Sequence, residues 1–252
     1  MRPPPMLGVV ERRLLVNYRT DPQVTARLLP APLRPQLVNG SAVAGICLIR
    51  LGRLRPRPVP GTLGLRSENA AHRIAVEWDT PDGVATGVYI PRRDSDSLIN
   101  VMIGGRLFPG RHHRARFDVR ETAQDLQVAF ASADGTAAVR THVRTTGEWP
   151  VSALFANLDE ASGFFRRGSA GYSATRNGSC LDGLELQTTA WQVEPVEVLT
   201  AHSTFFEDTA RFPAGSATLD CALLMLDVPV AWNPLSPMPL DVSGYSVRAS
   251  SR

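Results

Sequence analysis

The sequence contains no lysine but has 27 arginines. Arginine stays protonated at any workable pH, whereas a desolvated lysine can lose its proton and attack a carbonyl to form an imine. The absence therefore excludes imine-forming aldolase or decarboxylase chemistry, pyridoxal phosphate held as an internal imine, and a phosphate-binding loop with its lysine. The α-amino group of Met1 is the one primary amine left, and chain termini are usually mobile.

Cysteines are few and widely separated. Cys47, Cys180 and Cys221 lack the short spacings that zinc sites use. Their surroundings are mostly apolar or made of small residues. We therefore expect reduced, buried thiols in a cytoplasmic protein.

Long hydrophobic runs are absent as well. No apolar stretch reaches the length of a membrane-spanning helix, and the first residues lack the continuous hydrophobic region of a signal peptide. The chain has 252 residues, of which 43% are hydrophobic, and this is enough for one substantial core. We expect one domain over residues 1–232, a loose proline- and serine-rich tail over residues 233–252, and no membrane partner.

Neither sign of charge is in large excess, because the net charge is +3 and acidic residues are interleaved with the arginines. A nucleic-acid-binding protein would need a continuous basic stripe. The most arginine-rich face is interrupted by acids and has few aromatic residues; it consists of Arg114, Arg116, Arg120, Arg140 and Arg144. We expect no nucleic-acid partner.

Familiar catalytic motifs are missing. The sequence has no G-x-S-x-G elbow, no G-x-G-x-x-G dinucleotide loop and no H-E-x-x-H helix. His112 and His113 are adjacent, but neighbouring side chains on a strand point apart, and no spaced third histidine or cysteine stands nearby. The sequence therefore predicts no metal site and no cofactor.

Alternation of apolar and polar residues is the strongest structural signal present, and it is typical of half-buried strands. The alternating segments are residues 73–78, 84–90, 114–120, 126–130, 139–144 and 184–198. The pairs Asp82-Gly83, Asp134-Gly135 and Asn177-Gly178 predict tight hairpin turns, because such pairs favour positive φ.

Helical patterns are short and marginal. Asp21-Pro22 predicts the start of a helix that Pro30 stops, residues 158–167 form a second candidate that Gly168 ends, and residues 203–212 form a third. Strands about ten residues apart with turns between them predict a mainly β (α+β) fold, in which a mostly antiparallel sheet closes or folds over itself.

Two segments resemble acetoacetate decarboxylases. One is Tyr18-Arg19-Thr20-Asp21 followed by Leu28-Leu29-Pro30-Ala31-Pro32-Leu33, and the other is Gly105-Arg106-Leu107-Phe108-Pro109. Over nearly its whole length, including Ser67 to Trp78 and Gly87 to Ser97, the chain is similar to a bacterial family of unknown function in the same superfamily. The resemblance implies an antiparallel β-barrel or cone around a small cavity, a few short peripheral helices, and a tendency to form homo-oligomers.

The chain departs from the decarboxylases at the reactive centre. Where that family has two catalytic lysines after the aromatic-Pro pair, this sequence has Gly110 and Arg111. The imine-forming group is therefore gone, while one cation remains. Arg111 is a candidate for holding a substrate carboxylate or stabilising an enolate without a covalent bond.

Glu68 and His72 are the candidate catalytic residues. Strand alternation puts both on one face, and Glu68 aligns loosely with a glutamate of the decarboxylase pocket. They would act as general base and general acid if burial moved their pKa values toward neutrality. The alternative is a structural role, in which Glu68 pairs with an arginine and His72 is a satisfied histidine at a strand start.

The other candidate substrate-binding residues are Arg19, Arg92 and Tyr89. Arg92 and Arg93 are adjacent, so only one of them can readily face a cavity. The alternatives are a solvated loop in which Asp94 and Asp96 neutralise the Arg92-Arg93 pair, and a salt bridge from Arg19 to Asp21 or Glu11.

These observations predict a small-molecule enzyme that acts without an imine on a carbonyl- or carboxylate-containing metabolite. Enolisation, hydration or cyclisation would fit such a site. The alternative is a non-catalytic binding or carrier protein that uses the same cavity. In both cases the expected ligand is a small anionic or carbonyl compound.

Overall fold

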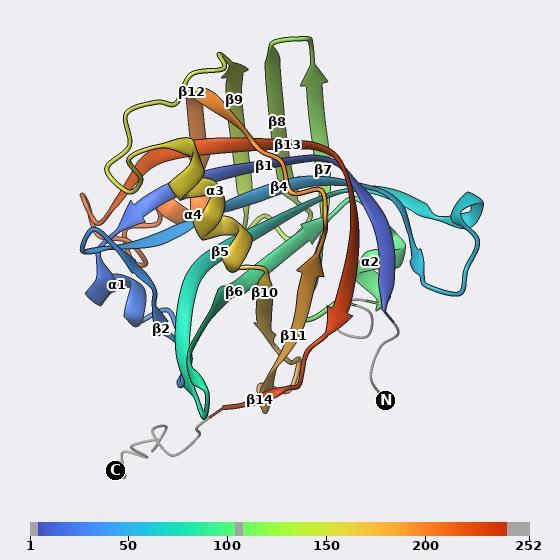
Figure 1. Cartoon of the computed structure of the whole chain (residues 1–252), viewed down its shortest axis with the longest axis horizontal. Helices are drawn as coiled ribbons and strands as arrows, with labels where there is room; N and C mark the ends of the chain where they lie inside the picture. Colours follow the sequence, from blue (N-terminus) through green and yellow to red (C-terminus); the bar gives the residue numbers. More distant parts are fainter. Residues whose placement is uncertain (1–4, 104–107, 241–252) are drawn as a thin grey trace.

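Residues 5–103 and 108–240 are described by a computed structural model, which is built mainly of strands (Figure 1). The strands are β1 Met6–Thr20, β2 Arg34–Pro35, β3 Leu37–Val38, β4 Ser41–Pro56, β5 Leu65–Thr80, β6 Gly83–Ser95, β7 His112–Glu121, β8 Asp125–Ser132, β9 Ala138–Thr145, β10 Ala170–Ala174, β11 Cys180–Gln187, β12 Glu194–Ser203, β13 Ala217–Pro234 and β14 Met238–Pro239. The helices are α1 Pro22–Ala26, α2 Leu98–Ile103, α3 Leu158–Arg167 and α4 Thr204–Glu207, and Gly61–Leu63 forms a 3-10 turn. None of the described helices has the length and apolarity needed to cross a bilayer.

The strands form one sheet that closes on itself twice. The order β13-β1-β4-β5 is continued by a β5–β6 pairing, and these five strands form a wall that we call the shared wall. One ring runs from β6 through β7, β8, β9 and β12 back to β13, and it is the upper ring in Figure 1. The lower ring runs from β6 through β10 and β11 back to β13.

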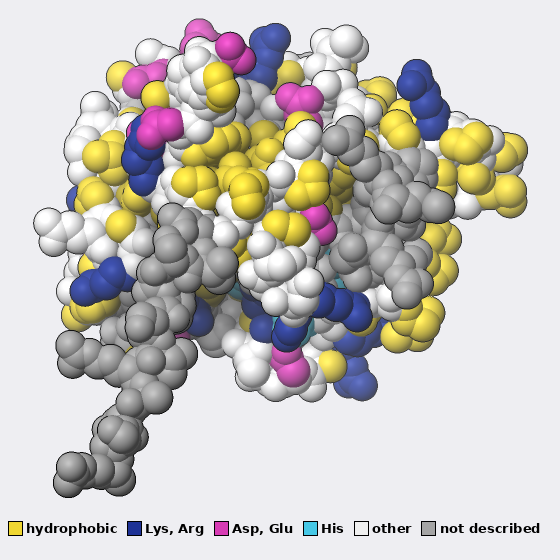
Figure 2. Space-filling view, turned by 90° about the horizontal axis from the view of Figure 1, so that it is seen from below, with side chains coloured by type: hydrophobic (Ala, Val, Ile, Leu, Met, Phe, Trp, Pro, Cys, Tyr) yellow, Lys and Arg dark blue, Asp and Glu magenta, His cyan; other side chains and the backbone are white. Residues whose placement is uncertain are grey.

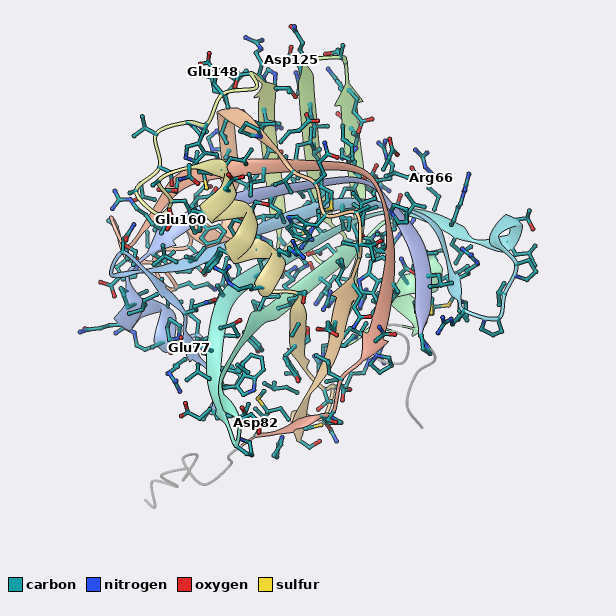
Figure 3. All side chains as sticks on the ribbon, viewed as in Figure 1. Arg66, Glu77, Asp82, Asp125, Glu148 and Glu160 are labelled. Carbon is teal, nitrogen blue, oxygen red and sulfur yellow. The ribbon has the colours of Figure 1, made fainter. Side chains whose placement is uncertain are left out.

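In the middle of β1, β4 and β5, both faces of the shared wall are buried, because each faces the interior of one ring. In β1, Leu14 packs with Leu48 and Ile74 on the upper-ring side, while its neighbour Leu15 packs with Leu223 on the other side. Leu14 and Leu15 are 0% and 1% exposed. Because successive side chains of a strand point to opposite faces, residue parity along the wall decides which ring a side chain enters. Asp125, at the start of β8, and Asp82, in the β5–β6 turn, lie at the two ends of the molecule (Figure 3).

The predicted hairpin turns are present. Gly83, Gly135 and Gly178 adopt φ values of 123°, 70° and 68° in the turns between β5 and β6, β8 and β9, and β10 and β11. Helix α3 has the predicted bounds and begins after Asn157, whose side chain accepts a hydrogen bond from the Glu160 backbone N–H. The mainly β fold class predicted from the sequence is confirmed.

Several predicted bounds are wrong. Residues 184–198 do not form one strand, because β11 ends at Gln187 after pairing with β10 and β13, and β12 begins at Glu194 to pair with β9. The chain crosses from the lower ring to the upper ring between these two strands. Helix α1 stops at Ala26, and α4 stops at Glu207, where Asp208 is extended and its side chain caps a turn.

The tail also needs a correction. Strand β13 continues to Pro234, and β14 pairs with β11 through Met238 and Leu181. Met238 is 9% exposed, so its burial attaches this segment to the lower ring. Residues 233–239 are therefore not a loose tail, and residues 241–252 lie outside the described residues.

Burial on both faces of the shared wall can be tested with a pair of neighbouring leucines. We expect Leu14→Ala and Leu15→Ala each to lower the free energy of unfolding by about 2–5 kcal/mol, since each leaves a cavity in a different core. Leu226→Ala is the control, because Leu226 is 48% exposed on the same sheet, and we expect a change within about 0.5 kcal/mol. Urea denaturation measures all three, and a mild effect at either Leu14 or Leu15 would show that one face is open to solvent.

Candidate functional site

A cavity of about 140 Å³ lies inside the lower ring, between the shared wall, β10, β11 and the end of α3. Its charged and hydrogen-bonding lining residues include Arg13, Cys47, Asn69, Arg73, Arg93, Asp94, Asn100, His112 and Ser169. Its apolar lining includes Phe165, Leu184 and Trp232. Seen from below, basic and histidine side chains gather on one part of the surface (Figure 2).

Arg73 enters the cavity because it has the opposite parity from Ile74 in β5. Its guanidinium lies 4.7 Å from the centre of the Phe165 ring and donates a hydrogen bond to the Asn17 side chain. Gly45 stands opposite Arg73 in β4, and a Cβ there would lie 3.4 Å from Arg73 Nη2 and 2.5 Å from the Val16 carbonyl oxygen. The glycine thus makes room for an arginine that is only 3% exposed.

The cavity arginines lack negative partners. Within the described residues, none of Arg13, Arg73 and Arg93 has a carboxylate oxygen within 4.0 Å, and Asp94, the one acidic lining residue, is bound by Arg92 at 2.8 Å. The Nε atoms of Arg73 and Arg93 are buried without a hydrogen-bond acceptor. Burial lowers the pKa of each of these two guanidinium groups to about 10, so both remain charged at neutral pH. Unpaired buried charges are costly, and a bound anion would compensate them.

His112 brings a neutral acceptor to the same cavity. Burial, and then the charge of Arg93, lower its pKa to about 3, while a hydrogen bond with the Pro109 backbone opposes the shift. Proline has no N–H, so the carbonyl accepts and the ring donates. Nε2 of His112 has no partner. We infer that Nδ1 carries the proton and that Nε2 keeps its lone pair.

Cys47 completes the polar lining. Its sulfur accepts a hydrogen bond of 3.3 Å from Arg13 Nε, and the residue is 7% exposed. Cys221 is also buried, as predicted, and Cys180 is half-buried; all three cysteines are free. Burial raises the pKa of the Cys221 thiol to about 12.

Glu68 and His72 lie on one face of β5, but that face belongs to the upper ring. Glu68 bonds Arg12 and Arg50 at 2.6 Å each, and Glu121 binds the same two arginines. Arg12 is 2% exposed, so this ion-pair cluster is largely buried. Glu68 therefore pairs with arginines, as in the structural alternative given above. Its catalytic role stays a prediction.

His72 is buried among aromatic rings in the upper ring. It stacks on Phe205 with ring centres 4.5 Å apart, and its Nε2 lies 3.3 Å from Ser203 Oγ. Burial, then the charges of Arg92 and Arg211, lower its pKa to about 3, so the ring is neutral at pH 7. His72 and Arg92 line a second pocket together, outside the lower ring.

The remaining predicted residues lie apart from the lower-ring cavity. Arg111 is exposed and donates a hydrogen bond to the Arg176 carbonyl, and Arg19 is exposed on β1. Arg92 binds Asp94 and Asp134. Tyr89 is half-buried against the upper-ring core, and burial raises its pKa. Their substrate-binding roles stay predictions.

Sequence reasoning missed Arg13, Arg73, Arg93 and His112. Arg92 and Arg93 point to opposite sides of β6, and Arg93 is the one that lines the cavity. The pairing of β5 with β6 shifts register nearby, between His72 and Ile74. An arginine inside an otherwise apolar strand, such as Arg73 before Ile74, was the signal that could have found the site.

Gly110, the first of the two residues predicted to replace the lysine pair, has no room for a side chain. Gly110 has φ +82°, and a Cβ there would lie 2.7 Å from Ser173 Cβ. Residues 105–107 of the segment that resembles the decarboxylases lie outside the described residues. Within residues 5–103 and 108–240, no three His, Cys, Asp or Glu side chains are placed to hold a metal ion.

Solved structures with a similar fold include acetoacetate decarboxylases and an enzyme of enduracididine biosynthesis. Acetoacetate decarboxylase from Legionella pneumophila is 11% identical to this chain, and the match spans 93% of this chain and 88% of the decarboxylase, with a TM-score of 0.58. An acetoacetate decarboxylase-like enzyme from Sphingomonas wittichii is 12% identical, with coverages of 94% and 92% and a TM-score of 0.60. The enduracididine biosynthesis enzyme MppR complexed with pyruvate is 13% identical, with coverages of 94% and 92% and a TM-score of 0.54. At these identities the likeness establishes the fold alone.

The chain belongs to the family DUF2071, described as "Uncharacterized conserved protein", which matches residues 10–224. No curated protein matches the sequence significantly. The predicted resemblance to a family of unknown function is thereby confirmed. The fold implied by the resemblance to acetoacetate decarboxylases is the fold of these solved structures.

The structural role of Glu68 predicts a loss of stability on substitution. We expect Glu68→Gln to lower the free energy of unfolding by about 1–3 kcal/mol, since the buried Arg12 loses a charged partner. The control is Glu11→Gln, which removes a partner of the 64% exposed Arg66, and it should cost at most about 1 kcal/mol. Urea denaturation compares the two variants, and equal losses would contradict the assignment.

The neutral His72 predicts acid destabilisation. Its pKa is about 3 when folded, against an ordinary 6.5, so in that pH window the unfolded chain binds a proton that the folded chain does not. Stability therefore falls as pH drops below the ordinary value, by about 1.4 kcal/mol per pH unit for this group. We expect His72→Phe to reduce that slope between about pH 6 and pH 5 in urea denaturation. An unchanged slope would mean that His72 is protonated in the folded protein.

Proposed function

We propose that the protein binds a small carboxylate-bearing carbonyl compound in the lower-ring cavity and acts on it without forming an imine. The observation that carries the proposal is the set of three arginines, Arg13, Arg73 and Arg93, without carboxylate partners among the described residues. An engineered cavity of about 150 Å³ holds benzene, and this one measures about 140 Å³. A short oxo acid has a suitable size and charge.

The lining residues supply distinct roles. Arg73 and Arg93 would hold the carboxylate by charge-assisted hydrogen bonds, for which each has a free Nε donor. His112 Nε2 would accept a proton from the carbon next to the carbonyl, and the guanidinium charges would stabilise the resulting enolate. A bound anion near Arg93 would also offset the charge that helps to lower the pKa of His112.

Proteins of the same fold support this ligand class. They include an acetoacetate decarboxylase, and MppR complexed with pyruvate. The absence of lysine and the closed position at Gly110 favour a different use of the cavity here. The catalytic roles predicted for Glu68 and His72, and the substrate-binding role predicted for Arg92, would need a second site in the upper ring. The substrate-binding role predicted for Arg111 would need a site on the surface.

A carrier or binding protein is the second candidate function. It is favoured by the lining itself, since Asp94 is held by Arg92 and so the described lining residues offer no unpaired carboxylate as a base. A ligand that binds and is recovered without proton exchange would support this alternative.

Anion binding is tested by calorimetric titration with pyruvate and acetoacetate. We expect Arg93→Gln to weaken binding about tenfold to a hundredfold, because a charge-assisted hydrogen bond is lost. Arg27→Gln, which removes the same charge at an exposed position, is the control and should bind normally. Equal affinity in the two variants, or no binding of either acid to the wild type, would overturn the proposal.

Proton transfer is measured separately, by deuterium uptake into the methyl group of pyruvate in D₂O. We expect His112→Asn to bind pyruvate and to lose the exchange that the wild type supports. A wild-type protein that binds pyruvate but exchanges no protons would be a carrier.

A further inference from the structure

Cys47 lies where the positive charges of the cavity converge. Arg13, from β1, donates its Nε–H to the sulfur at 3.3 Å. Arg73, from β5, and Arg93, from β6, line the same cavity as the sulfur. Ala71 stands opposite Cys47 in β5, and its short side chain leaves the space beside the thiol open.

Independent features show that this space suits a ligand. Arg73, which is 3% exposed, and Arg93 line the same cavity, and both have Nε atoms without an acceptor. An anion would satisfy these donors, and Cys47 lines the cavity that they line. A carboxylate held by the arginines would bring the neighbouring carbon of a small ligand toward Cys47.

We propose that Cys47 is a nucleophilic thiol that adds reversibly to the ketone carbon of a 2-oxo acid held by Arg73 and Arg93. This inference rests on the proposed anion-binding function. It gives the cavity a covalent step in a chain that has no lysine.

The step is balanced without any further reactant. A bond forms between the Cys47 sulfur and the ketone carbon, and the π bond of the C=O group breaks. The thiol proton moves to the former ketone oxygen, so the product is a hemithioketal whose carboxylate is unchanged. Guanidinium groups stabilise the negative charge that develops on sulfur and oxygen during addition.

The other two cysteines are built-in controls. Cys221 is 1% exposed, and burial raises its pKa to about 12. Cys180 is half-buried at the start of β11 and does not line the cavity. The protein therefore has one thiol in a cavity lined by arginines, Cys47, one fully buried thiol, Cys221, and one partly accessible thiol outside the cavity, Cys180.

The first experiment compares alkylation of each cysteine by iodoacetate and iodoacetamide, followed by peptide mass spectrometry. The reagents differ in charge, and the arginines should favour the anion. We expect the ratio of iodoacetate to iodoacetamide rates at Cys47 to exceed that at Cys180 by about tenfold or more. Arg93→Gln should reduce the ratio at Cys47 and leave that at Cys180 unchanged. Cys221 reports folding, since it should stay unreactive in every variant.

Two results of this experiment would overturn the inference. One is a rate ratio at Cys47 equal to that at Cys180, and the other is a Cys47 that reacts with neither reagent while Cys180 does. If Cys221 became reactive in Arg93→Gln, that variant would be replaced by the milder Arg13→His. A rate ratio at Cys47 that did not change in Arg13→His would also count against the inference.

The second experiment detects the adduct by ¹³C NMR with pyruvate labelled at its ketone carbon. We expect a bound signal in the region of tetrahedral carbon for the wild type and for Cys180→Ser, and its loss in Cys47→Ser. Acetate, which has a carboxylate but no ketone, should still bind to Cys47→Ser. Acetate and pyruvate binding without a tetrahedral signal would overturn the thiol addition alone, whereas absence of all binding would overturn the proposed function as well.

Discussion

The burial of both faces of the shared wall is the constraint on which the rest of this structure depends. Strands β13, β1, β4, β5 and β6 belong to two rings, so the side chains in the middle of β1, from Leu14 to Asn17, are buried whichever way they point. Each residue must suit one of two interiors. Leu14 and Leu15 are therefore both buried, although they point in opposite directions. The same rule applies to polar residues, and it separates the ion pairs of Glu68 from the cavity that holds Arg73.

The two interiors use charge differently. In the upper-ring face, Arg12 and Arg50 are matched by Glu68 and Glu121, so the buried charge is compensated within the protein. In the lower ring, the arginines have only amide, sulfur and aromatic partners among the described residues, as Arg73 has with Asn17 and Phe165. A matched cluster leaves no buried charge uncompensated, whereas an unmatched cluster of buried charges is typical of a ligand site.

The failure to place the candidate site from the sequence has a simple geometric origin. Alternation correctly groups Glu68 with His72, but it cannot tell which face of a doubly covered strand borders the cavity. A strand with one solvent face would identify its inner face by apolar residues. In β5 both faces are apolar, with Ile74 on one and Ala75 on the other, so this signal is lost. The choice between Arg92 and Arg93 depended in addition on a local register shift.

The sequence by itself determined the chemistry that is excluded, the mainly β class, the hairpin turns and helix α3, because composition, strand period and turn residues act locally. It also carried the resemblance to the decarboxylase-like proteins. Only the tertiary structure decided that β1, β4, β5 and β6 bring Arg13, Cys47, Arg73 and Arg93 to one cavity. These residues are tens of positions apart in the chain, and the closure of a sheet through long-range pairing leaves no local signal in the residues that it brings together.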